Sequence, residues 1–558
     1  MIEQRKRVAL ALGLLAAVVV VIDRAAWAWV AEWREDQATN IWLGYTRSPL
    51  QVPVGLVSSI TLPNPNGLVL ISEFLSRLPN LWWVSTFLGV LQAAFLVWLC
   101  WLLAGGRRLF LIIIGPLLAS IVLRGSSVEL VLHWTLIPVN LLFFVGIVIY
   151  LRRPTPWVLP LLTTVLLLAP SIYLAGALNS IVYALIVLMV LVAKPAAVPR
   201  QGWVAPIIAS IGIALLSIWL TWLPYFREIG VAGVRQASGY AGLTGIERLG
   251  AAAEAIIRFP IWSLVQYGEY GTVQGLPPLQ VDQRVQSLLV FSAYQWSLRI
   301  MLLQGFICYL LVIIAAIIIA IRRRPLREVI SPGTGAIGAG LVLMLLFVIL
   351  SYAIAPLLGA AIWAREQRLD ETVQFIPFLL IIWFATPLLL ELPEPIKKPA
   401  FALTCATSIL FTGLSLVIGF AVVRNNLLYK GQLLIADVPL LDKVDAVRFI
   451  AEDWKSRSSS LQIPVDYDVG GGKWDGIPSF GTRYQKWYPA PYVLGRAYDY
   501  LFLREHGLRN SQEGVQLRSF GGGRYLITYA FNRSPVVARY STRDYLFGRL
   551  RVTVVLGR

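Results

Sequence analysis

Two adjacent carboxylates, Glu35 and Asp36, directly follow the first long apolar run of the chain. A carboxylate at a membrane surface is partly desolvated, so its pKa rises toward neutrality and it can serve as a general base at a bound hydroxyl. Acidic residues also favour the first turn of a helix, where they interact with the helix dipole. The residues alone therefore indicate either a catalytic base or an ordinary helix start.

The residues after this acidic pair predict a structured loop rather than a linker. Ala38 to Tyr45 has the pattern of a short amphipathic helix. The proline- and asparagine-rich segment LPNPNG, at 62–67, comes next and then turns helical. A further acidic candidate, Glu129, lies near Arg124 in a short connection between apolar runs, where it is either a functional carboxylate or an ordinary surface glutamate.

Composition places these residues in a membrane protein. Of the 558 residues, 57% are hydrophobic and 14% are charged, whereas soluble domains average about 25% charged residues. The mean hydropathy of +0.70 excludes a soluble enzyme, a disordered chain and a fibrous protein, and it predicts an all-α polytopic membrane protein. The net charge of +18 lies largely in short loops, where it orients helices, so nucleic acid is not an expected partner.

Metal and redox chemistry have little support in the sequence. The cysteines Cys100, Cys308 and Cys405 lie within apolar segments, and the two histidines, His133 and His506, are far apart in the chain. Neither a CxxC pair nor a histidine cluster of the kind that binds zinc is present in the sequence. We therefore expect neither a metal ion nor a cofactor.

Apolar runs of spanning length predict about 11 transmembrane helices, because about 20 apolar residues cross a hydrocarbon core of ~30 Å. These runs cover about 8–29, 81–104, 109–123, 130–151, 157–174, 177–193, 203–224, 297–320, 337–360, 373–391 and 400–423. Alternate loops are basic, as cytoplasmic loops are, which predicts a cytoplasmic N-terminus and places the chain after residue 424 outside.

Three regions are too long to be simple connections: about 30–80, about 225–296 and 424–558. Under this topology all three lie on the extracytoplasmic side of the cell membrane. The last region alternates β-prone pieces such as RYLITYAF with helical pieces such as APYVLGRAYDYLFLREHG, which predicts an α+β fold. We expect two domains, a multi-pass module over 1–423 and an extracytoplasmic soluble domain over 424–558.

The order of these parts resembles the GT-C glycosyltransferases, especially the group of protein O-mannosyltransferases and aminoarabinose transferases. The resemblance covers residues 1–420 in layout and rests on short patches: Glu35-Asp36-Gln37-Ala38, where many relatives read Asp-Glu-Ala; LPNPNGLVLI; LRGSSVELVLHW; and AREQRLDETVQFIP. Gln37 departs from the glutamate of the family pattern, and Glu129 departs from the more usual aspartate.

This resemblance implies a transferase that moves a hexose or pentose from a polyprenyl-phosphate donor to an acceptor hydroxyl, with inversion, at the outer face. Asp36 would be the general base, with Glu35 and Glu129 as further catalytic candidates, and no metal would take part. Arginines would hold the phosphate, because a guanidinium fork matches its oxygens. The implied substrate-binding residues are Arg124, Arg258, Arg284, Arg365, Arg368, Tyr45, Asn64 and Asn66. The implied partners are the lipid-linked donor, membrane lipid and an acceptor lipid, glycan or protein.

Two other classes of protein stay open. A transporter or flippase of lipid-linked glycans would need ionisable or broken helices within the membrane, whereas the predicted spans are nearly free of ionisable residues. A non-catalytic scaffold that binds a partner through 424–558 is also compatible with the sequence.

Overall fold

The structure, a computed structural model, describes residues 2–31, 35–47, 51–57, 63–104, 135–174, 176–193, 201–238, 440–468, 495–511, 524–530, 540–548 and 550–557, with single residues between these ranges. Three helical segments within these ranges are long and apolar enough to cross a membrane: Gly13–Val30, Leu81–Leu102 and Gly202–Gly230. The helices Leu136–Arg152 and Val158–Ile172 are apolar and shorter. The chain is a polytopic membrane protein, as its composition predicts.

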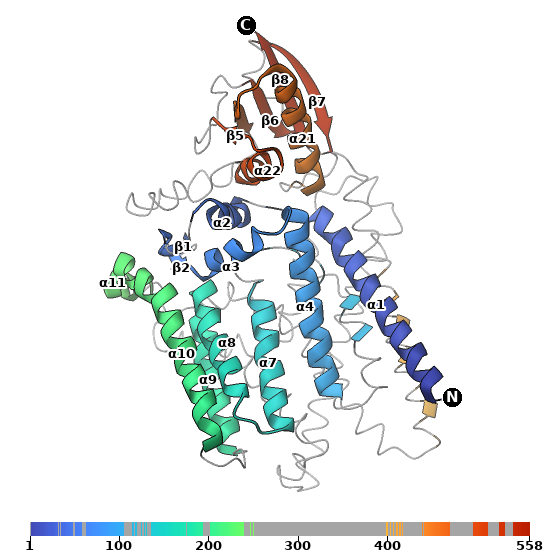
Figure 1. Cartoon of the computed structure of the whole chain (residues 1–558), viewed down its shortest axis with the longest axis vertical. Coiled ribbons are helices and arrows are strands. Elements are labelled where there is room, and N and C mark those ends of the chain that lie inside the picture. Colours follow the sequence, from blue (N-terminus) through green and yellow to red (C-terminus); the bar gives the residue numbers. More distant parts are fainter. Residues whose placement is uncertain are drawn as a thin grey trace.

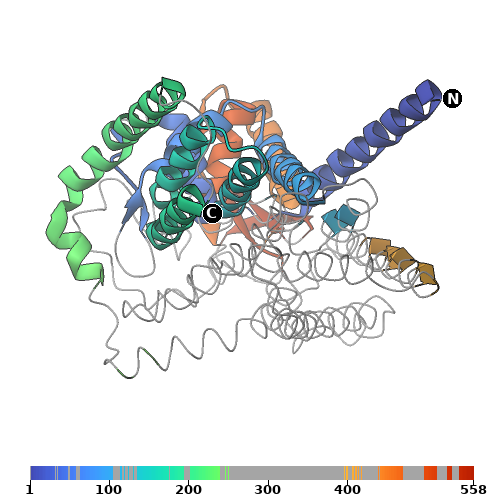
Figure 2. The ribbon, with the colours of Figure 1, turned by 90° about the horizontal axis from the view of Figure 1, so that it is seen from below.

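The apolar helices pack side by side in one bundle. They are α1 (Ile2–Val30), α4 (Leu81–Ala104), α7 (Leu136–Arg152), α8 (Val158–Ile172), α9 (Gly176–Ala193) and α10 (Gln201–Ser217). Contacts run from α1 to α4, from α4 to α7, and then among α7, α8, α9 and α10 (Figure 1). In the view of Figure 2, α1 diverges from the other helices toward its N-terminus.

Several predicted spans agree closely with observed helices. The run 81–104 has the bounds of α4, and the runs 157–174 and 177–193 correspond to α8 and α9. Within the run 130–151 the structure has α7, which begins at Leu136. The predicted spans 297–320, 337–360 and 373–391 lie outside the described residues, and only scattered residues of 109–123 and 400–423 are described. The expected total of about 11 spans therefore stays a prediction.

The seventh predicted span differs from an uninterrupted helix. After α10 comes a π-helical turn, Ile218–Trp222, and then α11, Leu223–Ser238, which reaches well into the region expected to be a loop. Pro224 provides the physical reason, because proline has no N–H for the carbonyl four residues earlier and forces a local rearrangement of the helix. Within α11, Gly230 has φ of 73°, which kinks the helix again.

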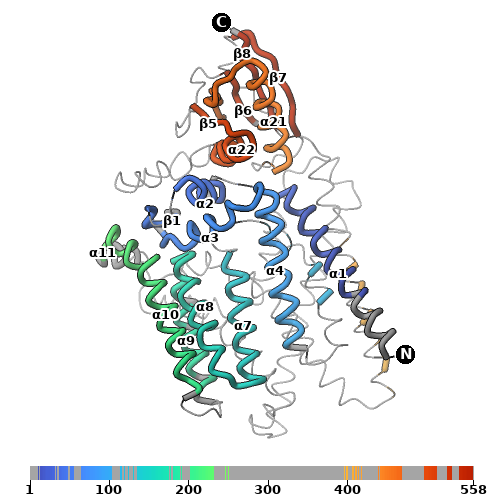
Figure 3. The backbone as a smooth tube through the Cα atoms, in the orientation of Figure 1, coloured from blue at the N-terminus to red at the C-terminus, as the bar shows by residue number. Residues whose placement is uncertain are grey.

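The first long loop folds against one end of the helical bundle. It contains α2 (Glu35–Thr46), β1 (Val54–Val57), β2 (Pro63–Pro65) and α3 (Gly67–Leu75), with β1 and β2 antiparallel. The helix predicted over Ala38 to Tyr45 is present and longer. The trace in Figure 3 shows α2 and α3 lying across the ends of α4, α7 and α8.

The C-terminal residues form helices packed on a mixed sheet. The helices are α21 (Leu440–Arg457) and α22 (Arg496–His506), and the strands are β3 (Gln462–Ile463), β4 (Val465–Asp468), β5 (Arg509–Asn510), β6 (Tyr525–Tyr529), β7 (Ser541–Phe547) and β8 (Leu550–Gly557). The larger sheet has the order β4-β6-β8-β7, with β4 parallel to β6 and the other pairs antiparallel. We call residues 440–557 the C-terminal domain; it lies beyond α2, at the end of the bundle opposite the N-terminus (Figure 1).

Candidate functional site between the helical bundle and the C-terminal domain

The acidic pair lies where the bundle, the first loop and the C-terminal domain meet. Glu35 and Asp36 form the first turn of α2, a few residues after α1 ends at Val30. Their side chains lie outside the description, so the structure places these two residues by their backbone. Because α2 lies between the bundle and α22 (Figure 1), the start of α2 is fixed from two directions.

Tryptophans attach the start of α2 to the bundle. Trp33 is fully buried, and its indole Nε1 donates to Ser85 Oγ on α4 at 3.0 Å. Trp82 lies one turn before Ser85 on α4, and its Nε1 donates to the Ala25 carbonyl of α1 at 2.8 Å. The rings of Trp82 and Trp29 stack with centroids 5.3 Å apart. These contacts fix the end of α1 against the beginning of α4.

The first turn of α21 contacts the segment between α1 and α2 from the side opposite α4. The Leu440 N–H donates to the Ala31 carbonyl at 3.1 Å, and Lys443 Nζ donates to the Trp33 carbonyl. Helix ends leave such N–H and C=O groups without intrahelical partners, and here two helix ends satisfy each other. Lys443 also lies over the Tyr498 ring, 5.7 Å from its centroid.

Cations of α22 cover the aromatic side chains of α2. The Arg496 guanidinium lies 5.2 Å from the centroid of the Trp42 ring, and the Arg504 guanidinium lies 5.4 Å from that of Tyr45. Tyr45, predicted to bind substrate, also meets Tyr500 edge-on with centroids 5.7 Å apart. Its side chain thus belongs to the interface between α2 and the C-terminal domain, and a part in substrate binding stays a prediction.

A buried polar network orients Arg496 within the C-terminal domain. Tyr467 donates to Asp499 Oδ1 at 2.7 Å, and Asn510 Nδ2 donates to the same oxygen at 3.1 Å. Arg496 NH1 lies 4.0 Å from the other Asp499 oxygen. Burial, with a contribution from the Asp499 charge, raises the pKa of Tyr467 well above its ordinary value, so the phenol stays a donor to the carboxylate.

Asn64 and Asn66, also predicted to bind substrate, anchor the first loop to the bundle. Asn64 Oδ1 accepts the Leu174 N–H at 2.9 Å. Asn66 Nδ2 donates to the Val52 carbonyl at 3.1 Å and to the Leu220 carbonyl at 3.2 Å. Leu220 is four residues before Pro224, which has no N–H, so Asn66 supplies the hydrogen bond to the Leu220 carbonyl that a helical N–H would otherwise make. Both side chains are fully buried, which accounts for their presence structurally and leaves substrate binding a prediction.

Arg124 is buried and paired rather than exposed in a surface connection. Its guanidinium binds the Asp23 carboxylate of α1, with Nε 3.0 Å from Oδ2, and lies 5.0 Å from the centroid of the Trp27 ring. Arg24 NH1 reaches the same carboxylate at 2.5 Å. These charges correct the expectation that the spans are nearly free of ionisable residues, because Asp23 and Arg24 lie within the segment Gly13–Val30. A charge inside an apolar run is the sequence signal that could have identified the cluster.

The remaining candidates lie outside the described residues: Glu129, Arg258, Arg284, Arg365 and Arg368. Among the residues that the structure does describe, no three histidine, cysteine, aspartate or glutamate side chains are grouped to hold a metal ion. The expectation of a metal-free site therefore stays a prediction. The cations that sequence reasoning missed, Lys443, Arg496 and Arg504, belong to a domain that carried no recognisable motif.

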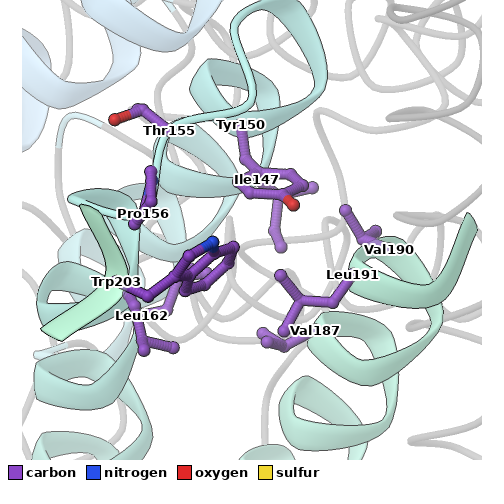
Figure 4. Close-up of a pocket in the computed structure, with 10 residues that line it drawn as sticks. Ile147, Tyr150, Thr155, Pro156, Leu162, Val187, Val190, Leu191 and Trp203 are labelled. Carbon is purple, nitrogen blue, oxygen red and sulfur yellow. The ribbon is translucent and has the colours of Figure 1, made fainter. Parts of the chain in front are cut away.

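A small pocket lies at the other end of the bundle, among α7, α8, α9 and α10. Figure 4 shows Ile147, Leu162, Val187 and Leu191 around it, with Tyr150 and the Trp203 indole at its edge. Its lining residues include no carboxylate and no cation. The pocket therefore lacks the groups for the candidate chemistry, and it is remote from α2.

No protein-family model and no curated protein matches the sequence. Among solved structures, the chain is similar to that of ArnT from Cupriavidus metallidurans, crystallised with bound undecaprenyl phosphate. The likeness covers 98% of both chains with a TM-score of 0.44 and 11% sequence identity. At that TM-score and identity, the likeness is too weak to carry an argument about fold or function.

Proposed function

We propose that the chain is a membrane glycosyltransferase of the GT-C type. It would transfer a hexose or pentose from a polyprenyl-phosphate donor to an acceptor hydroxyl at the extracytoplasmic face, and the acceptor would be a lipid, a glycan or a protein. The observation that supports this most is the position of α2: a helix beginning with Glu35 and Asp36 lies across the end of an apolar bundle, beneath a folded domain.

The proposed reaction is a single displacement. The Asp36 carboxylate takes the proton of the acceptor hydroxyl, whose oxygen attacks the anomeric carbon on the face opposite the phosphate. The bond between that carbon and the phosphate oxygen breaks, and the polyprenyl phosphate leaves with the electron pair. The configuration at the anomeric carbon therefore inverts.

The other candidate residues have supporting parts in this proposal. Glu35 and Glu129 are the remaining acidic candidates for catalysis. Arginines would neutralise the departing phosphate, since a guanidinium binds two of its oxygens at once. We assign this part to Arg258, Arg284, Arg365 and Arg368, because the guanidinium of Arg124 already binds Asp23.

The experiment uses the full-length protein in nanodiscs with a panel of radiolabelled polyprenyl-phosphate sugars and a membrane extract as the source of acceptor. Wild type is compared with Asp36→Asn and with Asp445→Asn, a control that changes an exposed carboxylate on α21. We expect transfer to fall by about 100-fold or more in Asp36→Asn, since general bases contribute about 10²- to 10⁴-fold. Donor binding and the Asp445→Asn control should be unchanged.

Full transfer by Asp36→Asn would overturn the assignment of the base. An equal loss in Asp445→Asn would show that the loss in Asp36→Asn reflects general damage. Retention of configuration in the product would contradict the single displacement.

A flippase of lipid-linked glycans is the second candidate, and the buried charges of α1 favour it. Asp23 and Arg24 lie six or seven residues before the end of α1, roughly 10 Å along the helix axis. Charges at such depth often mark a transport path. A flippase would move a labelled glycan lipid across a proteoliposome membrane without cleaving it, whereas the transferase would release the polyprenyl phosphate.

A further inference from the structure

We propose that Lys443 of the C-terminal domain is a positioning residue for the acidic pair, which makes this domain a working part of the site. The inference rests on the proposed function for its catalytic consequence. The structural part of the inference stands on contacts between described residues, and it can be tested without any substrate.

The contact of Lys443 is specific to the chain segment that introduces α2. Its Nζ donates to the carbonyl of Trp33, two residues before Glu35 and three before Asp36. Only 6% of Lys443 is exposed, although lysine is among the residues least often buried. A buried ammonium that donates to a backbone carbonyl forms a charge-assisted hydrogen bond, which is stronger than a neutral one.

Trp33 is held at both its side chain and its backbone, so the segment that leads into α2 has little freedom. The Trp33 indole is bound to Ser85 of α4, and its carbonyl is bound to Lys443 of α21. The neighbouring Ala31 carbonyl is bound by the Leu440 N–H. The start of α2 is therefore held between two parts of the structure, the bundle and the C-terminal domain.

Loss of the ammonium would remove the contact of the C-terminal domain that lies nearest to α2, while the Leu440 N–H would still bind the Ala31 carbonyl. Trp42 and Tyr45 farther along α2 would still be covered by Arg496 and Arg504, so α2 would stay in place as a whole. The first turn, which carries Glu35 and Asp36, would gain freedom. Small displacements of a catalytic group are costly, since a shift of about 1 Å can lower a rate by about 100-fold.

The test compares three substitutions at Lys443 with one control, all in the full-length protein. Lys443→Met keeps the length of the side chain without a donor, Lys443→Gln keeps an uncharged donor, and Lys443→Arg keeps a charged one. The control Lys455→Met changes an exposed lysine on the same helix. The amides of residues 39–41 bond to the carbonyls of the first turn of α2, so their hydrogen exchange reports the order of that turn. Exchange in β6 and β8 reports whether the C-terminal domain is folded.

We expect Lys443→Met to speed exchange at the amides of residues 39–41 while β6 and β8 stay protected, and to lower kcat by about 10-fold or more with the donor KM nearly unchanged. Lys443→Gln should fall between, Lys443→Arg should restore most of both properties, and Lys455→Met should match wild type. If Lys443→Met unfolds the C-terminal domain, Lys443→Gln and Lys443→Arg carry the comparison.

Two outcomes would overturn the inference. Unchanged exchange at the start of α2 in Lys443→Met would show that the lysine does not hold it. Suppose that Asp36→Asn is inactive, but Lys443→Met combines faster exchange with full transfer activity. This result would show that ordering the start of α2 has no catalytic importance. If Asp36→Asn is itself fully active, the proposed base fails, while the exchange result still decides whether Lys443 orders the segment.

Discussion

Arg124 binds both carboxylate oxygens of Asp23, a residue 101 positions earlier in the chain. Asp23 lies in α1, which leads to Glu35 and Asp36, and Arg124 lies five residues before Glu129. The ion pair therefore joins the two chain segments that carry the three acidic candidates. Because Arg24 binds the same carboxylate, one acid serves two guanidinium groups in this cluster.

Replacement of Asp23 by asparagine should destabilise the protein strongly. Removing one partner of a buried ion pair leaves an uncompensated charge and typically costs about 3–5 kcal/mol, and here one carboxylate is shared by two arginines. The unfolding temperature in detergent should fall well below that of wild type. The control Asp445→Asn breaks an exposed pair with Arg448, and such pairs contribute only about 0–1 kcal/mol. Equal unfolding temperatures for the two variants would contradict a structural role for the cluster.

Gly44 sets the distance between α2 and α3. A Cβ atom at this position would lie 2.5 Å from the Glu73 backbone nitrogen and 2.6 Å from the Ser72 carbonyl carbon. Gly44→Ala should force the helices apart and cost about 1–3 kcal/mol, the usual range for overpacking. It should also reduce sugar transfer, because α2 carries the acidic pair.

Gly212 of α10 provides the matched control, since a Cβ there would meet nothing within 4 Å. Alanine favours a helix over glycine by about 0.5–1 kcal/mol, so Gly212→Ala should be neutral or slightly stabilising. Unfolding temperatures and transfer rates of the two variants provide the comparison. A Gly44→Ala protein as stable and active as Gly212→Ala would refute the close packing of α2 on α3.

Much of the helical layout was predictable because it depends on local sequence. The bounds of α4 follow from an apolar run preceded by Pro79-Asn80 and followed by Gly105-Gly106. The break in the seventh predicted span also had a local signal, Pro224, but apolar composition outweighed it. Both features can be seen within a short window of residues.

The attachments of the site were not predictable, because each joins residues far apart in the chain. Lys443 and Trp33 are 410 positions apart, and Asn66 and Leu220 are 154 apart. Nothing in the sequence next to Lys443 distinguishes it from Lys455, which is exposed on the same helix. Similarly, Asn64 and Asn66 read as loop asparagines that could face a substrate, whereas packing turns them toward backbone groups of the bundle.

The dependence of the π-helical turn on Asn66 can be tested with a second substitution. Asn66→Ala removes the donor to the Leu220 and Val52 carbonyls and should cost about 1–3 kcal/mol, the usual cost of leaving buried groups unsatisfied. Pro224→Ala restores a backbone N–H four residues after Leu220. The double variant should therefore be more stable than the sum of the two single changes predicts. Additive changes in unfolding temperature would show that Asn66 and Pro224 act independently.

Acidification should weaken the C-terminal domain through His506. Burial, helped by the charges of Lys455 and Arg448 and opposed by Glu452, lowers the pKa of His506 below its ordinary 6.5. The unfolded chain therefore takes up a proton near pH 6.5 that the folded domain accepts only at lower pH. The stability that neutral His506 provides is fully present above about pH 6.5, and it is lost as the pH falls through the lower pKa of the folded state.

The measurement is the unfolding temperature of the full-length protein between about pH 7.5 and pH 5, a range that covers the ordinary histidine pKa. Wild type should lose stability on acidification, and His506→Gln should lose less, because glutamine takes up no proton. His133→Gln is the matched control, since the sequence contains 2 histidines. The same acid sensitivity in His506→Gln as in wild type would assign it to other groups, and a flattened response in His133→Gln would assign it to the other histidine.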